Sequence, residues 1–356
     1  MNNIQRKSLS LSLLFALSLS MVGCNKEVNY NLHTEEQTKF LEGDYNLISL
    51  YANGTKELSR PNVVTLEWDD FSNDIYDVKV SKNKDMEELA AWYSTSDNKV
   101  TIYNLEINET YYWYAYNDDG ETKVKSFTTE SHAPRSLFID GITNARDLGG
   151  YPTSDGSSTK QGLIYRTSRF NENETTDLLI TEAGIQEMVK KLKVKTELDL
   201  REVNNNENGG IVESPLGKDV KYVSIPMKSG GNCILLNDDI LKDAFAVFGN
   251  KDNYPIVMHC SIGTDRTGML AFLINALLGV SEEDLYKDYL YSNFANIGGN
   301  RNPSTISTYI KTFKYYDGET LAEKAKKSVI ISTNLESCSL TNKIYCSSIS
   351  SSSFVV

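Results

Sequence analysis

Cysteine and histidine are scarce in this chain of 356 residues, which contains five cysteines and three histidines. Cys233, Cys338 and Cys346 follow no spacing pattern, so we expect no disulfide framework. His259 and Cys260 are neighbours, but they lack the second, spaced pair of ligands that zinc sites use. We therefore expect neither a metal nor another cofactor.

Apolar runs long enough to span a membrane are also missing. Near the N-terminus, basic residues precede a serine- and leucine-rich run from Leu9 to Val22, a length typical of a signal peptide. Gly23 and Cys24 follow, and this ending resembles the cleavage site of bacterial lipoproteins. We expect residues 1–23 to be removed and Cys24 to carry the lipid that anchors an exported protein to a membrane. An ordinary secretory signal is the alternative.

The most informative segment runs from His259 to Gly268 and reads H-C-S-I-G-T-D-R-T-G. Apolar residues 254–258 predict a buried strand before it, and apolar residues 269–278 predict a buried helix after it. Backbone N–H groups of such a loop and the positive end of the following helix converge on one point. That point suits a phosphate dianion.

The side chains of this loop are suited to covalent chemistry on phosphorus. Positive surroundings favour the thiolate, so we expect Cys260 to attack phosphorus without a separate base. Arg266 would bind two phosphate oxygens through its planar guanidinium. Thr267 would offer its hydroxyl to the sulfur when the phosphocysteine breaks down, and His259 would orient the loop. We expect the phosphate to contact Ser261, Ile262, Gly263, Thr264, Asp265 and Arg266.

The pattern H-C-x-x-G-x-x-R-T-G resembles the active-site signature of cysteine-dependent tyrosine phosphatases. Three further segments resemble motifs of a bacterial tyrosine-protein phosphatase family with secreted members that act on phosphotyrosine and phosphoinositides. They are N-A-R-D-L-G-G-Y at 144–151, G-L-I-Y-R-T-S at 162–168 and E-L-D-L-R-E at 197–202. The resemblance implies a catalytic domain over residues 137–328 that hydrolyses phosphate monoesters through a phosphocysteine intermediate on Cys260.

One loop position departs from the family pattern, because Thr264 stands where dual-specificity members carry lysine. Each added phosphate on a substrate is attracted by each added cation of the loop. Loss of this lysine should therefore weaken the binding of polyphosphorylated inositol lipids more than the binding of a single phosphotyrosine. Phosphotyrosine protein is therefore the first expected substrate, and phosphoinositides are the alternative.

Two other functions use part of the same pattern. An arsenate-reducing or redox protein also has a cysteine–arginine loop, but the motifs at 144–151 and 197–202 do not belong to it. A catalytically idle phosphate-binding surface protein would not need the thiol, so the presence of both Cys260 and Arg266 argues against it.

The acid that protonates the leaving group has two candidates. In the family that the chain resembles, the aspartate directly before the loop arginine is the proposed acid, which is Asp265 here. A structural role that holds Arg266 in place is the alternative. Asp199 ends a predicted strand, where α/β sheets place their ligand sites, and an ion pair with a nearby arginine is its alternative.

Three arginines of the motifs, Arg146, Arg166 and Arg201, flank the expected pocket in a chain whose net charge is −12. We expect no nucleic-acid partner for so acidic a chain. The arginines could support phosphate binding, but buried ion pairs of Arg146 with Asp199 or Asp147 would also explain the motifs.

The region before the catalytic segment has another pattern, in which apolar residues alternate with period two and predict half-buried strands. Residues 105–113 resemble the part of a fibronectin type III module that forms a tyrosine corner. We expect a β-sandwich at 60–130, preceded by an anchor and linker at 24–59.

After a linker at Pro134, predicted helices alternate with apolar strands, which favours an α/β fold with a central, mainly parallel sheet. The serine-rich tail at 329–356 has no assigned structure.

Overall fold

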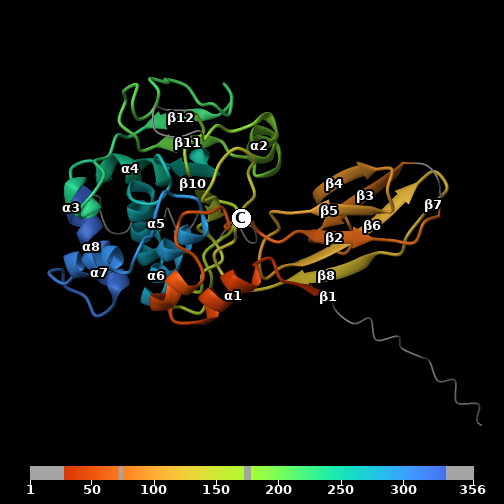
Figure 1. Ribbon diagram of the computed structural model, residues 1–356, viewed down its shortest axis with the longest axis horizontal. Helices are drawn as coiled ribbons and strands as arrows, with labels where there is room; N and C mark the ends of the chain where they lie inside the picture. The colour runs from red at the N-terminus through yellow and green to blue at the C-terminus, as the bar shows by residue number, and fades with distance from the viewer. Residues whose placement is uncertain (1–27, 72–74, 172–177, 334–356) are drawn as a thin grey trace, which may run out of the picture.

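The computed structural model describes residues 28–71, 75–171 and 178–333, which form a smaller all-strand part beside a larger α/β part (Figure 1). The predicted signal peptide, Cys24 and the tail from residue 334 lie outside the described residues. Within the described ranges, no helix combines the length and the apolar character that crossing a membrane requires.

The all-strand part consists of two sheets that share one core. The larger sheet contains β1 (Val28–Tyr30), β8 (Lys125–Thr129), β6 (Thr110–Asn117), β3 (Tyr76–Ser81), β4 (Leu89–Thr95) and β7 (Gly120–Glu121). The smaller sheet contains β2 (Val64–Glu67) and β5 (Lys99–Ile102). Strand β6 buries alternate residues, Tyr111, Trp113 and Ala115, in a core that also contains Val64 and Leu66. The period-two pattern of the sequence thus corresponds to the burial of alternate side chains in this core.

The Tyr111 hydroxyl accepts a hydrogen bond from the Glu106 backbone N–H at 2.9 Å, which is the contact expected of a tyrosine corner. Strand β4 was not predicted, because its exposed residues Ala90 and Trp92 are as apolar as the half-buried Ala91 and Tyr93. The sequence therefore shows no alternation of apolar and polar residues there.

The α/β part is built on a five-stranded sheet with the order β12-β11-β13-β10-β9. Its strands are β9 (Arg146–Asp147), β10 (Ile164–Thr167), β11 (Thr196–Asp199), β12 (Lys221–Ser224) and β13 (Ile256–His259). All neighbouring pairs are parallel except β9 with β10. The predicted α/β fold with a mainly parallel central sheet is confirmed.

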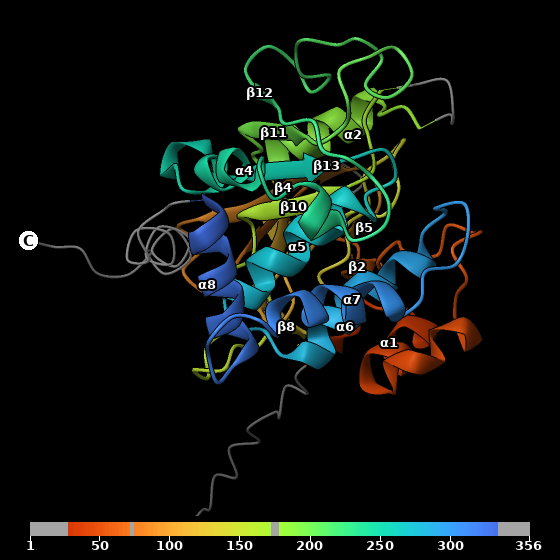
Figure 2. The same cartoon turned by 90° about the vertical axis from the view of Figure 1, so that its left-hand side faces the viewer.

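Helices cover both faces of this sheet. One face packs against α2 (Glu182–Gln186) and the π-helical turn η2 (Glu187–Lys191), whose Met188 shares a core with Tyr165 and Val257. The opposite face packs against α5 (Arg266–Leu277), which is buried along its whole length. Figure 2 shows α6, α7 and α8 on the same side as α5. The remaining elements are α3 (Cys233–Leu236), α4 (Leu241–Phe248), η3 (Lys251–Asn253), α6 (Glu282–Tyr291), η4 (Ser292–Phe294), α7 (Ser304–Phe313) and α8 (Leu321–Thr333).

The segment 34–59 differs from the expected linker, because it folds onto the α/β part. It contains α1 (Glu35–Glu42), which opens with a capping box at Thr34, and the 3-10 helix η1 (Tyr45–Leu50). Tyr45 stacks on Tyr286 of α6 with ring centroids 4.3 Å apart. Lys287 donates a hydrogen bond to the Leu41 carbonyl at 2.6 Å.

The C-terminal end of the described chain also differs from expectation. Helix α8 runs on to Thr333, and it buries Ala325 and Val329 in the core of the α/β part. The expected start of an unstructured tail at 329 therefore falls inside a helix.

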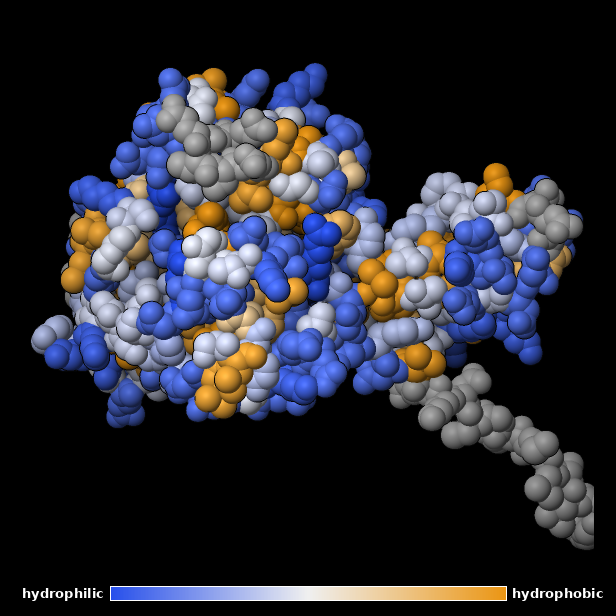
Figure 3. Space-filling model, viewed as in Figure 1, coloured by the Kyte–Doolittle hydropathy of each residue, from blue (hydrophilic) through white to orange (hydrophobic). Residues whose placement is uncertain are grey.

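The two parts are joined by side chains that bind the backbone of the opposite part. The Asn104 amide donates to the Phe138 carbonyl at 2.9 Å and accepts from the Phe138 N–H at 2.7 Å. Gln161 makes the corresponding pair with Ile107, at 2.9 and 3.0 Å. Figure 3 shows hydrophilic residues interspersed with hydrophobic patches on this face of both parts.

Candidate active site

The loop that carries Cys260 connects β13 to the N-terminus of α5, as the sequence predicts. Cys260 is a free cysteine with 2% of its surface exposed. Gly263 has a φ of +74°, and a Cβ there would lie 2.4 Å from the Thr167 carbonyl oxygen. Only glycine fits this turn, which explains the fixed glycine of the motif.

Hydrogen bonds from below hold the loop in its shape. The Asn144 amide donates to the Ile262 carbonyl at 3.0 Å, and the Arg166 guanidinium donates to the Gly263 carbonyl at 2.7 Å. In a trans peptide the next N–H points away from the carbonyl. The N–H groups of Gly263 and Thr264 therefore face the opposite side, beside the start of α5. This orientation is compatible with the anion site that the sequence predicts.

Asp288 of α6 is the centre of the floor beneath the loop. Its Oδ1 lies 2.9 Å from Arg146 Nε, and its Oδ2 lies 2.5 Å from Arg166 Nη1. The Tyr151 hydroxyl donates to Oδ1 at 3.0 Å. The expected ion pair of Arg146 with Asp199 or Asp147 is therefore wrong. The partner is an aspartate on a helix far along the chain.

Burial and charge act against each other in this floor. Burial raises the pKa of Asp288, but Arg146 and Arg166 outweigh it and hold the pKa below its ordinary value. Burial, together with the neighbouring charge of Arg146, lowers the pKa of Arg166 to about 10. Both arginines are at most 1% exposed. They therefore support the conformation of the loop and are too buried to contact a substrate.

Asp147 also serves structure. Its carboxylate accepts hydrogen bonds from the N–H groups of Gly149 and Gly162 at 2.8 and 2.6 Å. Arg135 Nη1 lies 3.1 Å from Asp147 Oδ2, and the same guanidinium donates to the Asn104 carbonyl of the all-strand part. The D-L-G-G motif therefore secures the boundary between the two parts.

His259 is oriented by Glu197, a residue that the sequence analysis did not single out. Its Nε2 lies 2.9 Å from Glu197 Oε1, and its Nδ1 lies 3.2 Å from the Cys260 carbonyl oxygen. Both side chains are fully buried. This geometry supports the expected role of His259 in orienting the loop.

Asp199 makes the ion pair that was the alternative to an acid role. Arg201 donates to its two oxygens from Nε and Nη2, at 2.9 and 2.7 Å, and the Tyr222 hydroxyl donates at 3.0 Å. Burial alone would raise the pKa of Asp199, but His259 and Arg201 hold it below the ordinary value. Glu197, Asp199 and His259 cluster closely enough to bind a metal ion, but Arg201 already provides the positive charge there. We assign no metal to this cluster.

Arg266 begins α5 and is 4% exposed. Its Nη1 and Nη2 lie 2.5 and 3.3 Å from the two oxygens of Glu207, and Nη2 donates to Ser261 Oγ at 3.4 Å. Burial alone would lower the pKa of Arg266, but Cys260 and Glu207 outweigh it and raise the pKa above its ordinary value. The partner of Arg266 is therefore Glu207 and not Asp265.

Asp265 lies at the mouth of the loop, where its side chain is 36% exposed. Its Oδ1 lies 3.7 Å from Arg301 Nε. Asp265 therefore does not hold Arg266 in place, which was the alternative to its role as the acid. Thr267 is fully buried, and its hydroxyl has no hydrogen-bond partner within the described part of the chain.

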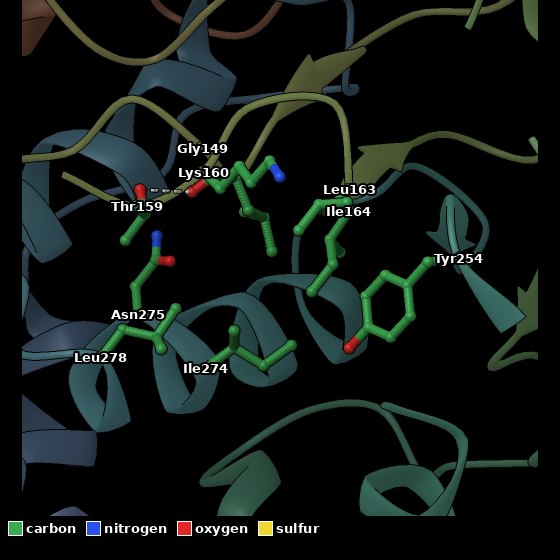
Figure 4. Close-up of a pocket in the computed structure, with 10 residues that line it drawn as sticks. Gly149, Thr159, Lys160, Leu163, Ile164, Tyr254, Ile274, Asn275 and Leu278 are labelled. Atoms are coloured by element: carbon green, nitrogen blue, oxygen red, sulfur yellow. Dashed lines mark hydrogen bonds between the residues drawn. The ribbon is translucent and has the colours of Figure 1, made fainter. Parts of the chain in front are cut away.

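A pocket elsewhere on α5 is separate from this loop (Figure 4). It is lined at the opposite end of the helix by Ile274, Asn275 and Leu278, and across from them by Leu163 and Tyr254. Its volume of about 20 Å³ fits roughly one water molecule. The Asn275 amide lacks a hydrogen-bond partner among the described residues, so a buried water would satisfy it.

Comparison with known proteins places the α/β part in a family. Residues 137–324 match the model described as "Tyrosine phosphatase family". A Cupriavidus necator protein named "Putative tyrosine-protein phosphatase" is 29% identical over 174 residues, which are 45% of this chain and 64% of that protein. The chain therefore spans less than two thirds of the length of that relative.

Two solved structures of the Siw14 catalytic core were also found. One, described as the core catalytic domain of the PP-IP phosphatase from S. cerevisiae in complex with citrate, is 20% identical and covers 46% of this chain and 85% of that chain, with a TM-score of 0.30. The other is 19% identical and covers 51% and 91%, with a TM-score of 0.31.

Proposed function

Because the chain belongs to the tyrosine phosphatase family, we propose that it hydrolyses phosphate monoesters through a phosphocysteine on Cys260, with phosphotyrosine in proteins as the substrate. The observation that carries this proposal is the geometry of the loop. A free, buried thiol lies at the end of β13, next to outward-facing N–H groups and the N-terminus of α5. A thiol is needed for covalent chemistry but not for binding alone.

The first step transfers the phosphoryl group. The Cys260 thiolate forms a bond to phosphorus while the bond from phosphorus to the ester oxygen breaks. Asp265 donates its proton to that oxygen, and the tyrosine or alcohol leaves. Arg266 exchanges Glu207 for two phosphate oxygens and balances the charge that spreads over them in the transition state.

The second step regenerates the enzyme. Asp265, now a carboxylate, accepts a proton from a water molecule that attacks phosphorus. The sulfur–phosphorus bond breaks, Thr267 donates a hydrogen bond to the departing sulfur, and inorganic phosphate leaves. The unpartnered hydroxyl of Thr267 is consistent with this role.

We extend the proposal to the rest of the chain. The part at 60–130 is a fibronectin type III-like module, for which the Tyr111 contact is the support. The protein is an exported lipoprotein that Cys24 anchors to a membrane, for which the N-terminal sequence pattern is the support.

Phosphate release tests the function. Residues 26–356 are assayed without added metal on a phosphotyrosine peptide and on a phosphoinositide, with Cys260→Ser as the matched control. We expect release from the peptide by the native sequence and none by the control. Release that persists in Cys260→Ser would contradict the mechanism, and no release from either substrate would favour an idle binding protein.

A further inference from the structure

We infer that Arg301 supplies the positive charge that the Cys260 loop lacks at Thr264, and that it selects monoesters with a second anionic group beside the reacting phosphate. The inference rests on the proposed function, because it concerns the substrate of the same loop. Arg301 lies between η4 and α7, 37 residues after Thr264. No local motif connects the two residues.

The guanidinium of Arg301 lies against Thr264, the loop residue that stands in place of lysine, and against the next residue, Asp265. Its Nη2 donates to Thr264 Oγ1 at 3.5 Å, and its Nε lies 3.7 Å from Asp265 Oδ1. The side chain of Arg301 is 22% exposed, although Thr264 is buried. The cation thus lies beside the substituted position and remains accessible from solvent.

Backbone contacts fix the segment that carries Arg301. Asn293 donates to the Arg301 carbonyl at 2.9 Å and accepts from the Arg301 N–H at 2.7 Å. The Gly54 carbonyl accepts from the N–H groups of Ile297 and Gly299, both at 3.0 Å. A Cβ on Gly54, whose φ is +75°, would lie 2.2 Å from the Gly299 carbonyl oxygen. The segment 34–59 therefore holds Arg301 over the loop.

The present partner of Arg301 is easily replaced. A separation of 3.7 Å exceeds that of a hydrogen bond, and a partly exposed ion pair contributes little to stability. An anionic group on the substrate can take the place of Asp265. The exchange also releases Asp265, the proposed acid, from its ion pair. A substrate with one phosphate and no further charge gains neither effect.

The test compares two probes that share a phenyl phosphate, phenyl phosphate itself and resorcinol bisphosphate, which carries a second phosphate on the ring, in the full chain. We expect Arg301→Gln to raise KM for resorcinol bisphosphate about fivefold and to leave KM for phenyl phosphate nearly unchanged. Arg301→Lys should retain most of the preference. Arg60→Gln is the matched control, because Arg60 is the other described arginine that is not buried.

Direct binding separates this inference from the proposed hydrolysis. In Cys260→Ser, calorimetry should show tighter binding of resorcinol bisphosphate than of phenyl phosphate, and adding Arg301→Gln should remove the difference. If the native protein releases no phosphate but this binding difference holds, hydrolysis fails and the role of Arg301 stands. If hydrolysis proceeds and Arg301→Gln changes both probes equally, or neither, the role of Arg301 is refuted.

Discussion

The floor and the rim of the Cys260 loop are both built from arginine–carboxylate pairs, but they differ in exposure. The floor pairs Arg146 and Arg166 with Asp288, and its carboxylate is 5% exposed. The rim pairs Arg266 with Glu207 and Arg301 with Asp265, and these carboxylates are 30% and 36% exposed.

The comparison suggests a rule, in which the accessibility of the carboxylate separates a structural arginine from one that we propose to bind the ligand. A buried pair cannot exchange its partner, because removal of one charge leaves the other desolvated. A pair at the rim exchanges its carboxylate for a phosphate at little cost, because water already reaches it. The same residue type therefore supports the loop from below and, in the proposed function, binds the ligand from above.

The largest expected effect is a loss of activity when an arginine of the rim is substituted. Arg266→Lys removes the planar fork that binds two phosphate oxygens, so we expect kcat/KM to fall about a thousandfold. The free energy of unfolding should fall by only about 1 kcal/mol, because the charge remains and the hydrogen bonds of Arg266 to the Leu200 and Met227 carbonyls are long. Steady-state kinetics and urea unfolding measure the two quantities.

Arg60→Lys is the control for this substitution, since it makes the same exchange at a surface site. If the loss in kcat/KM, expressed as a free energy, is matched by an equal loss in the free energy of unfolding, Arg266 is a structural residue like the arginines of the floor. The contrast between floor and rim would then fail.

The second largest expected effect is a loss of stability when the carboxylate of the floor is substituted. Asp288→Asn leaves Arg146 and Arg166 without a counter-charge, so we expect the free energy of unfolding to fall by about 3 kcal/mol at neutral pH. Glu283→Gln is the control, because Glu283 lies on the same helix with its side chain 62% exposed. A loss no larger than in this control would contradict the assignment.

The pH dependence of that difference has a definite sign. The arginines hold the pKa of Asp288 below its ordinary value in the folded protein. An unfolded aspartate titrates near about 4, so the stabilisation is present above that pH. It is lost as the pH falls through the lower, folded pKa. Unfolding curves should therefore show that native protein and Asp288→Asn converge below about pH 4.

The smallest effect should come from Glu207. Glu207→Gln removes a negative charge that competes with phosphate for Arg266, so inorganic phosphate should bind about threefold more tightly. Stability should change by less than about 1 kcal/mol, because the pair is partly exposed. Calorimetry with inorganic phosphate measures the first quantity. Weaker binding would mean that Glu207 positions Arg266 and does not compete with the ligand.

The parts of the site that the sequence predicts are those that depend on local spacing. The strand, loop and helix around Cys260 follow from one continuous pattern, and the parallel sheet follows from the alternation of helices and strands. Period-two alternation also predicts β2, β3, β5 and β6 of the all-strand part.

The residues that the sequence could not reveal act across long separations. Asp288 lies 142 positions from Arg146, and Arg301 lies 37 positions from Thr264. An aspartate on a helix gives no sign of its partner until the fold brings the two together. Strand β4 was missed for another reason, because apolar residues lie on both of its faces and the sequence does not show the alternation of exposed and half-buried positions.

The path of the chain between β1 and β2 has a consequence for the limits of the catalytic unit. Strand β1 pairs with β8, the following segment 34–59 crosses to α6 and η4, and the chain then returns to β2. The match to the family begins only at residue 137. A fragment cut there would expose the surface of Phe294 and Tyr286 that α1 and η1 cover, and it would leave the segment around Arg301 without Gly54. The region that matches the family is thus smaller than the region whose elements pack together.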